Sequence, residues 1–302
     1  MIGRLFIYFK EMFPLQIHLP FALVMYFSLF FMTQALSVKD ELHVNRAAIV
    51  GCFTFFGVML LMRILDEFKD VETDRQLFPD RPLLRGAVKY SDIRSLGILV
   101  FTIISILNLM IGGWIFLFYI LMMIYTWLCF KWFFIEKISR PNLILTFITH
   151  QPLTLFVNVY VVAIAITGTP LTGLHPQLSL AVLAYSLPIF AWETSRKIRA
   201  KGGETEYVTY SKLFGPRKAC LLPLSGLLMY LVSLGILAYF CTFDHWFYWV
   251  LIFIGLGVII VYSRFIQKPE KERLILKPVT EVTILAINLV LLIYLVSNMG
   301  FG

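Results

Sequence analysis

Charged residues are scarce in this sequence. Asp, Glu, Lys and Arg make up 15% of its 302 residues, 59% are hydrophobic, and the mean hydropathy is +0.82. These values lie far from those of a soluble domain, so the composition excludes an ordinary soluble fold. The sequence also lacks a low-complexity linker or a separate soluble segment, and we expect one domain over residues 1–302.

Cysteine is scarce as well. The four cysteines are Cys52, Cys129, Cys220 and Cys241, which lie in or at the ends of apolar stretches. None has a CxxC or zinc-binding spacing, so we interpret them as inert buried thiols. The first long apolar stretch lacks a small-residue cleavage site, and we therefore expect a full membrane span and no cleavable signal peptide.

Long hydrophobic runs, by contrast, are abundant. A helix needs about 20 mainly apolar residues to span a bilayer, and nine stretches approach or exceed that length. They are residues 14–37, 45–65, 91–111, 114–134, 142–168, 178–195, 217–241, 245–266 and 278–300. Gly112 and Gly113 separate two of them, as expected in a tight helical hairpin. The sequence therefore predicts an all-α polytopic membrane protein with nine transmembrane helices in one bundle.

Lys and Arg are nearly absent from one side of the predicted bundle. If the N-terminus is cytoplasmic, only Lys39 and Arg46 fall on the outer side. All other Lys and Arg residues fall in or beside the N-terminal segment and the loops 66–90, 131–141, 196–216 and 267–277. Because cytoplasmic loops are enriched in Lys and Arg, we expect a cytoplasmic N-terminus and cytoplasmic charged loops. Basic loops beside membrane lipids also account for the net charge of +8 without a nucleic-acid partner.

The second apolar stretch ends in an acidic segment, residues 66–74 with the sequence DEFKDVETD. Read as a helix, this segment places Asp66, Asp70 and Asp74 on one face, at spacing i, i+4 and i+8. Like charges at this spacing repel one another. A divalent cation would offset the repulsion, and carboxylates together with substrate phosphates suit Mg²⁺. The alternative interpretation is a solvated acidic helix end.

A second charged block, residues 193–206, follows the sixth apolar stretch and falls on the same predicted side of the membrane. Carboxylates can hold Mg²⁺ on a diphosphate while Arg and Lys contact the phosphate oxygens directly. The candidates for that contact are Arg81, Lys131, Arg196, Lys197, Arg199 and Lys212. The positive-inside rule explains each of them singly, whereas as a set at one face they favour diphosphate binding.

A few polar residues lie within or near the predicted spans. Gln16 and His18, near the start of the first span, are candidates for hydrogen bonds to a second substrate. Asn158 is a further candidate for such a bond, but for Asn158 and His150 we favour polar contacts between helices. The many Phe, Tyr and Trp residues can house a hydrocarbon chain, and their ring faces stabilise a cation.

The acidic segment and its surroundings resemble the UbiA superfamily of intramembrane prenyltransferases. The first family motif, Asn-Asp-x-x-Asp-x-x-x-Asp, is similar to residues 66–74, with Asp66 and Glu67 in place of Asn-Asp. The Arg-Pro-Leu sequence that often follows it is similar to residues 81–83, with a Gly a few residues on at Gly86. The resemblance extends over essentially the whole chain, including the number of spans.

Two further regions carry the resemblance. Tyr125 and Lys131 are similar to the Tyr and basic residue of the fourth span of the family. The second, Asp-rich motif is matched more loosely by residues 193–204 followed by residues 209–215. Ala200 stands where an Asp is common, and basic residues crowd the block. Either basic groups replace part of the role of the second metal, or the site serves a different substrate.

The resemblance implies a nine-helix bundle with a central cavity, in which Mg²⁺ held by both acidic motifs activates a prenyl diphosphate. It implies metal ligands at Asp66, Glu67, Asp70, Asp74, Glu193 and Glu204. It implies catalytic roles for Asp66, Asp70, Asp74, Tyr125 and Lys131. In these roles Lys131 would contact the diphosphate and Tyr125 would shield the carbocation. The usual Arg-Pro pair at the first span is Phe13-Pro14 here, so the contacts to the acceptor differ from those of the family.

Three functions follow from these interpretations. The leading hypothesis is Mg²⁺-dependent transfer of a prenyl group from a prenyl diphosphate to a small, aromatic acceptor within a bacterial or archaeal cell membrane. In the alternative, a terpene cyclase of the same superfamily, a double bond of the prenyl chain itself captures the cation. A transporter or lipid-binding protein is less favoured, because its charges would lie near the membrane midplane rather than at one face.

Overall fold

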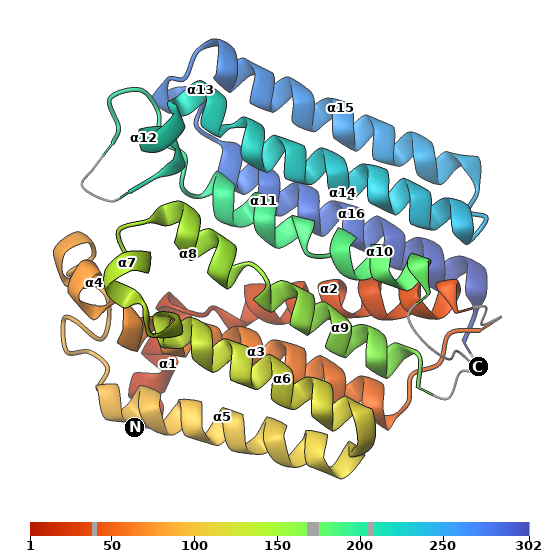
Figure 1. Cartoon of the computed structure of the whole chain (residues 1–302), viewed down its shortest axis with the longest axis horizontal. Helices are drawn as coiled ribbons and strands as arrows, with labels where there is room; N and C mark the ends of the chain where they lie inside the picture. The colour runs from red at the N-terminus through yellow and green to blue at the C-terminus, as the bar shows by residue number, and fades with distance from the viewer. Residues whose placement is uncertain (38–40, 168–174, 205–207, 302) are drawn as a thin grey trace. The chain divides into compact units, whose positions relative to one another are not determined.

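The computed structural model describes residues 1–37, 41–167, 175–204 and 208–301 (Figure 1). Lys39, the last residue of the predicted stretch 142–168, and residues 205 and 206 of the second charged block lie outside the described residues. Within the described ranges the chain is α-helical and forms no strand, apart from one isolated β-bridge between Leu42 and Phe301.

The described part of the chain forms sixteen α-helices and two short 3₁₀ helices. They are α1 (Ile2–Glu11), α2 (Leu15–Leu36), α3 (Arg46–Lys69), α4 (Val71–Leu77), α5 (Tyr90–Ile111), α6 (Gly113–Phe130), η1 (Trp132–Phe134), α7 (Glu136–Ser139), α8 (Leu143–His150), α9 (Leu153–Ala165), α10 (Pro176–Ala184), α11 (Leu187–Ser195), α12 (Tyr210–Phe214), α13 (Pro216–Ala219), α14 (Leu221–Phe240), α15 (His245–Gln267), η2 (Lys271–Arg273) and α16 (Leu276–Met299).

Nine helical stretches of the described residues are long and apolar enough to cross a membrane. They are α2, α3, α5, α6, α8 with α9, α10 with α11, α13 with α14, α15, and η2 with α16. Each corresponds to one of the nine stretches expected from hydropathy. The prediction of an all-α polytopic membrane protein is therefore confirmed.

The fifth and sixth spans are broken rather than continuous, which hydropathy did not indicate. The fifth is interrupted at Gln151 and Pro152 between α8 and α9, and the sixth at Tyr185 and Ser186 between α10 and α11. Pro152 and Pro188 lie at these breaks, and proline lacks the N–H that a continuous helix needs. The helix of the second span, α3, continues past residue 65 to Lys69, as the helical interpretation of the acidic segment predicts.

The turn between α5 and α6 is the tight hairpin that the sequence predicted. Gly112 and Gly113 have φ of 72° and 56°, a left-handed conformation that glycine adopts without steric strain. Gly112 ends α5, and α6 begins at the next residue. The two helices consequently run side by side in opposite directions (Figure 1).

The chain divides into two compact units. Unit 1 comprises residues 1–27 and 44–134, and unit 2 comprises residues 28–43 and 135–302. Unit 1 contains α1, the start of α2, and α3 to α6 with η1, whereas unit 2 contains the rest of α2 and α7 to α16. The expectation of one domain over the whole chain, like the central cavity, stays a prediction.

In unit 1, α3 packs mainly against α5 and also contacts α6. The helices approach closely at Gly57, where an added Cβ would lie 2.9 Å from Cγ2 of Ile104. Near the same level, the Asn108 side-chain amide donates a 2.7 Å hydrogen bond to the Thr54 hydroxyl. Small residues and interhelical hydrogen bonds of this kind hold membrane helices together, since lipid is as apolar as the side chains.

In unit 2, α14 packs against α11, α10 and α15. Gly226 of α14 allows the approach to α11, because a Cβ there would lie 2.6 Å from Cδ1 of Phe190. A buried polar cluster joins four segments. The Ser28 and Tyr230 hydroxyls each donate 2.8 Å bonds to the Asn288 amide oxygen, and Tyr185 lies 2.7 Å from the Ser28 hydroxyl.

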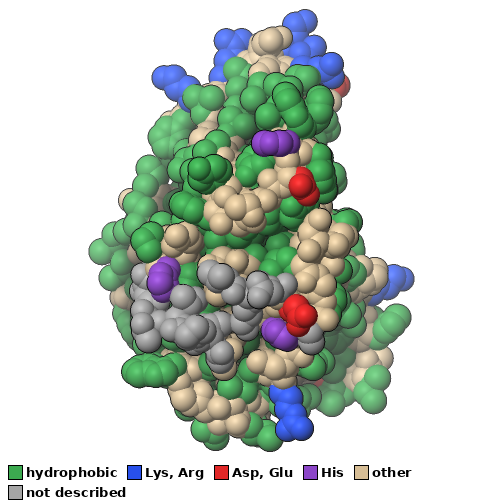
Figure 2. Space-filling model, turned by 90° about the vertical axis from the view of Figure 1, so that its right-hand side faces the viewer, with side chains coloured by type: hydrophobic (Ala, Val, Ile, Leu, Met, Phe, Trp, Pro, Cys, Tyr) green, Lys and Arg blue, Asp and Glu red, His purple; other side chains and the backbone are tan. Residues whose placement is uncertain are grey.

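The surface of the protein is largely apolar. Only 17% of the most apolar part of α5 is buried, although its mean hydropathy is 2.0, and bulky side chains such as Phe53 and Phe253 are more than 60% exposed. Figure 2 looks onto the helix ends at the right-hand side of Figure 1, where hydrophobic side chains also predominate and Lys and Arg lie near the edges. Apolar exposure on this scale requires lipid rather than water around it, so the protein is an integral membrane protein.

Candidate active site

The acidic segment of residues 66–74 is kinked rather than a continuous helix. The last turn of α3 carries Asp66 and Glu67, α4 begins at Val71, and Asp70 joins them with φ −105° and ψ 15°. Two i to i−4 backbone bonds bridge the kink, from Asp70 N to Asp66 O at 2.9 Å and from Asp74 N to Asp70 O at 2.8 Å. The helix expected over this segment is thus interrupted at Asp70, but the i, i+4 connection between these residues is kept.

Two of the carboxylates in this segment are buried and paired with arginine. Glu67 is 4% exposed and forms an ion pair with Arg63, one helical turn earlier in α3. Asp74 is 7% exposed and forms an ion pair with Arg81. A buried carboxylate needs such a partner, because an isolated charge loses its hydration. The predicted metal ligands of the first motif and the predicted phosphate contact Arg81 therefore lie together in unit 1, whereas Glu193 and Glu204 belong to unit 2.

The electrostatic balance at Asp74 is set mainly by burial. Burial raises the pKa of Asp74, and the neighbouring Asp70 raises this pKa further. Arg81 and Arg63 act in the opposite direction, but the pKa of Asp74 remains above its usual value. Arg81 is thus the neighbour that lowers this pKa most, and ionised carboxylates are the form that binds metal.

Arg81 belongs to a compact turn that follows α4. Backbone bonds from Leu84 N and Arg85 N to Arg81 O, at 2.9 and 3.0 Å, fold this turn back on itself. Leu83 is buried in the core of unit 1, and the Arg81 guanidinium lies 4.5 Å from the centre of the Phe78 ring. The Arg-Pro-Leu sequence therefore has a structural role at this turn. Its leucine packs in the core of unit 1, and its arginine forms the ion pair with Asp74.

Lys69 has a structural role that the sequence did not indicate. Its Nζ donates a 2.9 Å hydrogen bond to the Cys129 carbonyl and lies 3.9 Å from the centre of the Trp132 ring. Lys69 thereby ties the last turn of α3 to the last turn of α6. Residues 132–134 that follow are all left-handed, with φ between 51° and 60°, a conformation that is strained for bulky side chains.

Tyr125 and Lys131 lie at this same end of α6. Lys131 is the C-cap residue, is exposed, and has its Nζ 5.1 Å from the Phe130 ring centre. Tyr125 is half-buried and packs edge-to-face with Phe133 at 5.4 Å. Their predicted roles toward diphosphate and carbocation stay predictions, but Lys69 joins their helix end to the acidic segment.

Gln16 and His18 open α2 in unit 1. Gln16 is exposed. His18 is half-buried, stacks on Phe13 with ring centres 4.0 Å apart, and has its Nδ1 2.9 Å from the Pro14 carbonyl. The Nδ1 atom of His18 therefore contacts the start of the helix, and only Nε2 would be available for a hydrogen bond to a substrate.

The second charged block lies in unit 2 and is also internally paired. Glu193 accepts from Arg196 Nε at 2.5 Å and from Lys197 Nζ at 2.7 Å. Glu204 accepts a 2.5 Å hydrogen bond from the Thr209 hydroxyl, and Thr209 in turn caps α12 at Lys212 N. The Arg199 guanidinium donates to the carbonyls of residues 196 and 198. Each predicted residue here thus has a protein partner, and its role toward a ligand stays a prediction.

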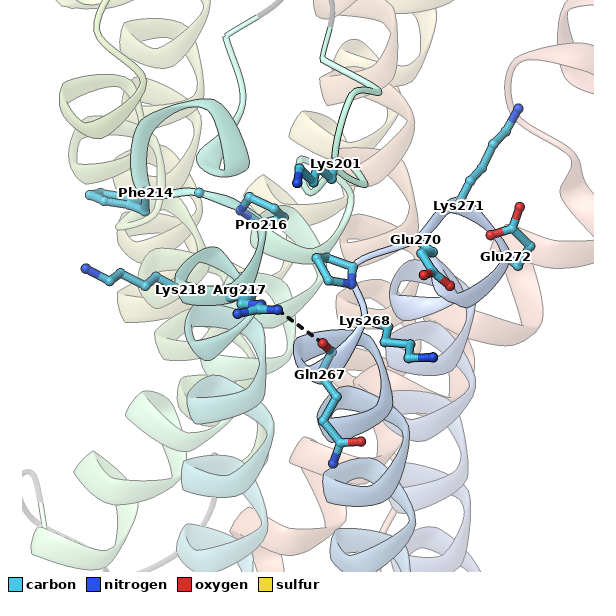
Figure 3. A pocket seen from close by; sticks show the side chains of 12 residues that line it. Lys201, Phe214, Pro216, Arg217, Lys218, Gln267, Lys268, Glu270, Lys271 and Glu272 are labelled. Atoms are coloured by element: carbon cyan, nitrogen blue, oxygen red, sulfur yellow. Dashed lines mark hydrogen bonds between the residues drawn. The ribbon is translucent and has the colours of Figure 1, made fainter.

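A groove of about 820 Å³ opens beside this block between α13 and the segment that follows α15 (Figure 3). Its basic lining residues are Lys201, Arg217, Lys218, Lys268 and Lys271. The side chains of Lys218 and Lys271 point away from each other in Figure 3, so the positive charges do not converge. Since the groove also contains none of the predicted site residues, we interpret it as a basic surface next to the membrane.

The donor atoms in the acidic segment fit Mg²⁺. The described part of the chain has no group of three or more His, Cys, Asp or Glu residues placed to hold a metal ion. Mg²⁺ does not require one, because it is bound through one or two carboxylates together with substrate phosphates and waters. Asp66, Glu67, Asp70 and Asp74 supply only carboxylate oxygens, which is the ligand type that Mg²⁺ prefers.

Two residues at this site escaped the sequence analysis. Arg63 lies within a predicted span. Its i, i+4 spacing to Glu67 is the sequence feature that could have indicated their ion pair. Tyr8 of α1 lies within electrostatic range of Arg63, Asp66, Glu67 and Arg81. No local sequence pattern connects residue 8 to residues 63–81, because their proximity arises from folding.

Comparison with known proteins gives a consistent result. The family model described as the UbiA prenyltransferase family matches residues 19–277. A solved structure of a UbiA homologue from Aeropyrum pernix K1 aligns with a TM-score of 0.63 and 18% identity, covering 91% of this chain and 98% of that one. A structure concerning digeranylgeranylglyceryl phosphate synthase in membranes aligns with a TM-score of 0.60 and 15% identity, covering 94% and 99%. No curated protein matches the chain in sequence.

Proposed function

The chain belongs to the UbiA prenyltransferase family, and from that premise we propose that it transfers a prenyl group from a prenyl diphosphate to a small, aromatic acceptor within the membrane. In this reaction the bond between the prenyl C1 carbon and the diphosphate oxygen breaks, and the electron pair leaves with pyrophosphate. The allylic carbocation then forms a bond to the acceptor, which loses a proton.

The observation that supports this proposal most directly is the pairing of carboxylates with arginines in unit 1. Glu67 pairs with Arg63 and Asp74 pairs with Arg81, next to Asp66 and Asp70. Such a site carries both kinds of group that a magnesium diphosphate requires, namely carboxylates for the metal and guanidinium groups for the phosphate oxygens. Arg is suited to that second task because its planar fork donates two parallel hydrogen bonds.

The metal would be held by Asp66, Glu67, Asp70 and Asp74. When bound, Mg²⁺ supplies Lewis-acid neutralisation of the negative charge that develops on the leaving pyrophosphate. The arginines exchange partners in this scheme, since a guanidinium released from its carboxylate can donate to a phosphate oxygen. Tyr125 and Lys131, at the adjoining end of α6, would face the carbocation and the diphosphate.

The predicted topology agrees with this scheme and is part of the proposal. We place the acidic segment, the Arg81 turn and the end of α6 at the cytoplasmic side, because Lys and Arg are concentrated there in the sequence. A prenyl diphosphate would then bind with its charged head at that surface and its hydrocarbon tail among apolar helices.

The test is pyrophosphate release by the purified protein with a series of prenyl diphosphates and aromatic acceptors, in the presence of Mg²⁺ or a chelator. Asp70→Asn should lower the turnover by at least about 100-fold, because it removes an anionic ligand. Glu72→Gln is the matched control, since Glu72 is an exposed carboxylate in the same segment and should retain activity.

The outcome also separates the alternatives. Formation of a cyclic product from the donor alone would indicate a terpene cyclase instead of a transferase. Wild-type turnover in Asp70→Asn would contradict the metal assignment, and absence of any pyrophosphate release would contradict the proposed reaction.

A further inference from the structure

A hydroxyl group without a hydrogen-bond partner lies next to the acidic segment. Tyr8 of α1 is fully buried, and its hydroxyl has no partner among the described residues. Buried hydroxyl groups are nearly always hydrogen-bonded, and an exception therefore requires an explanation. Phenylalanine would fill the same space in the core without that unfavourable burial of a polar atom.

The position of Tyr8 is fixed by two ion pairs at the ends of α1. Arg4 donates to both carboxylate oxygens of Asp92 at 2.5 and 2.9 Å, and Arg85 donates to both oxygens of Glu11 at 2.9 and 2.7 Å. Bidentate pairs of this kind constrain geometry as well as distance. They hold α1 against α5 and against the turn that also contains Arg81.

The ring of Tyr8 packs in the core of unit 1, in a cluster that includes Leu60, Ile64 and Leu83. Its hydroxyl end lies within electrostatic range of Arg63, Asp66, Glu67 and Arg81. Burial raises the pKa of Tyr8, so the hydroxyl is neutral at physiological pH and available as a donor. Tyr8 therefore brings an uncharged hydrogen-bond donor to a site otherwise made of charges.

The missing acceptor has a definite chemistry. The two arginines can only donate, and no carboxylate of the described residues accepts a hydrogen bond from Tyr8. Glu67 and Asp74 are already paired with Arg63 and Arg81. A ligand oxygen can supply the partner, and an anionic oxygen is the kind that two nearby guanidinium groups attract.

We propose that Tyr8 is a ligand-binding residue whose hydroxyl donates a hydrogen bond to a phosphoryl oxygen of the bound diphosphate, an inference that rests on the proposed function. In this role α1 is part of the substrate site and not only a surface helix. The two ion pairs at its ends set the position of the donor.

The experiment measures binding of inorganic pyrophosphate with Mg²⁺ by the shift in thermal unfolding of the purified protein, and so requires no knowledge of the acceptor. Tyr8→Phe should unfold at the same or a higher temperature without ligand, since an unsatisfied hydroxyl is removed. Its Kd for pyrophosphate should rise at least about tenfold, because a hydrogen bond to an anionic oxygen is lost.

Tyr119→Phe is the matched control. Tyr119 is also fully buried in unit 1, but its hydroxyl lies 2.6 Å from the Ser105 hydroxyl. This variant should unfold at a lower temperature and bind pyrophosphate like the wild type. A Tyr8→Phe variant that binds pyrophosphate with wild-type affinity would overturn this inference alone. A wild-type protein that pyrophosphate does not stabilise would overturn both this inference and diphosphate binding.

Discussion

Replacing Arg81 by methionine removes the cation that faces Asp74 while keeping much of the side-chain volume. The Asp74 side chain is 9% exposed and that of Arg81 is 25% exposed, so the carboxylate is the buried partner. Removing one partner of a buried pair costs about 3–5 kcal/mol in general. Because Arg81 is partly in contact with solvent, which screens the pair, we expect a loss of about 2–3 kcal/mol for Arg81→Met.

The double variant Arg81→Met with Asp74→Asn tests whether the loss of stability arises from the unpaired carboxylate of Asp74. Asp74→Asn alone should cost about 1 kcal/mol, since Arg81 can turn to solvent. With both charges gone no buried carboxylate is left unpaired, and the double variant should lose only about 1 kcal/mol. The two single losses would then exceed the loss of the double variant by about 2–3 kcal/mol, a coupling within the range expected for residues in direct contact.

The pH dependence supplies an independent check. The pKa of Asp74 is raised in the folded protein, and losing Arg81 should raise it further. A carboxyl group with a raised folded pKa favours the folded state at low pH, and that contribution is lost as the pH rises through the folded pKa. The stability deficit of Arg81→Met should therefore be larger at pH 8 than at pH 5.

The assay is reversible unfolding of the purified protein in detergent micelles with a chelator present, at both pH values. Equal deficits at pH 5 and pH 8, or single losses that simply add in the double variant, would show that the pair does not stabilise Asp74 in the way described.

Three further predictions concern packing and polar contacts, each measured as the change in unfolding free energy in the same micelles. Gly226→Ala should lose about 1–3 kcal/mol, because the new Cβ would overlap Phe190. An unchanged stability would mean that α14 can move away from Phe190 of α11 without loss of packing. Asn288→Leu should lose about 2–4 kcal/mol, since two buried hydroxyls then lack their acceptor, and Asn288→Asp should restore part of it. Lys69→Met should lose about 1–2 kcal/mol through its contact with Trp132 and its hydrogen bond to α6, whereas the exposed Lys137→Met should be neutral.

The spans could be predicted because hydropathy is a local property of the chain. All nine stretches appear as helices near their expected residues, since a helix in lipid satisfies its own backbone hydrogen bonds. The breaks at Pro152 and Pro188 were not predicted. Proline only makes a break possible, and neighbouring helices decide whether the chain uses it, as Pro20 within the unbroken α2 illustrates.

The candidate site could be predicted only in part. Residues 66–74 and Arg81 were identified from their composition and motif, and the structure places Asp74 and Arg81 in contact. The sequence did not indicate a structural role for Lys69, whose side chain donates a hydrogen bond to the end of α6. Tyr8 was missed because a single tyrosine in an amphipathic N-terminal helix carries no signal of its surroundings.

The sequence by itself determined which segments enter the membrane and which residue types gather at their ends, because both depend on the transfer free energy of consecutive side chains. Only the tertiary structure decided which charge faces which carboxylate, where Asp70 bends the helix, and that the Tyr8 hydroxyl is buried beside the acidic segment. The burial of the Tyr8 hydroxyl depends on contacts between segments far apart in the chain. The balance of burial and pairing that selects among such contacts is not a local property of any one segment.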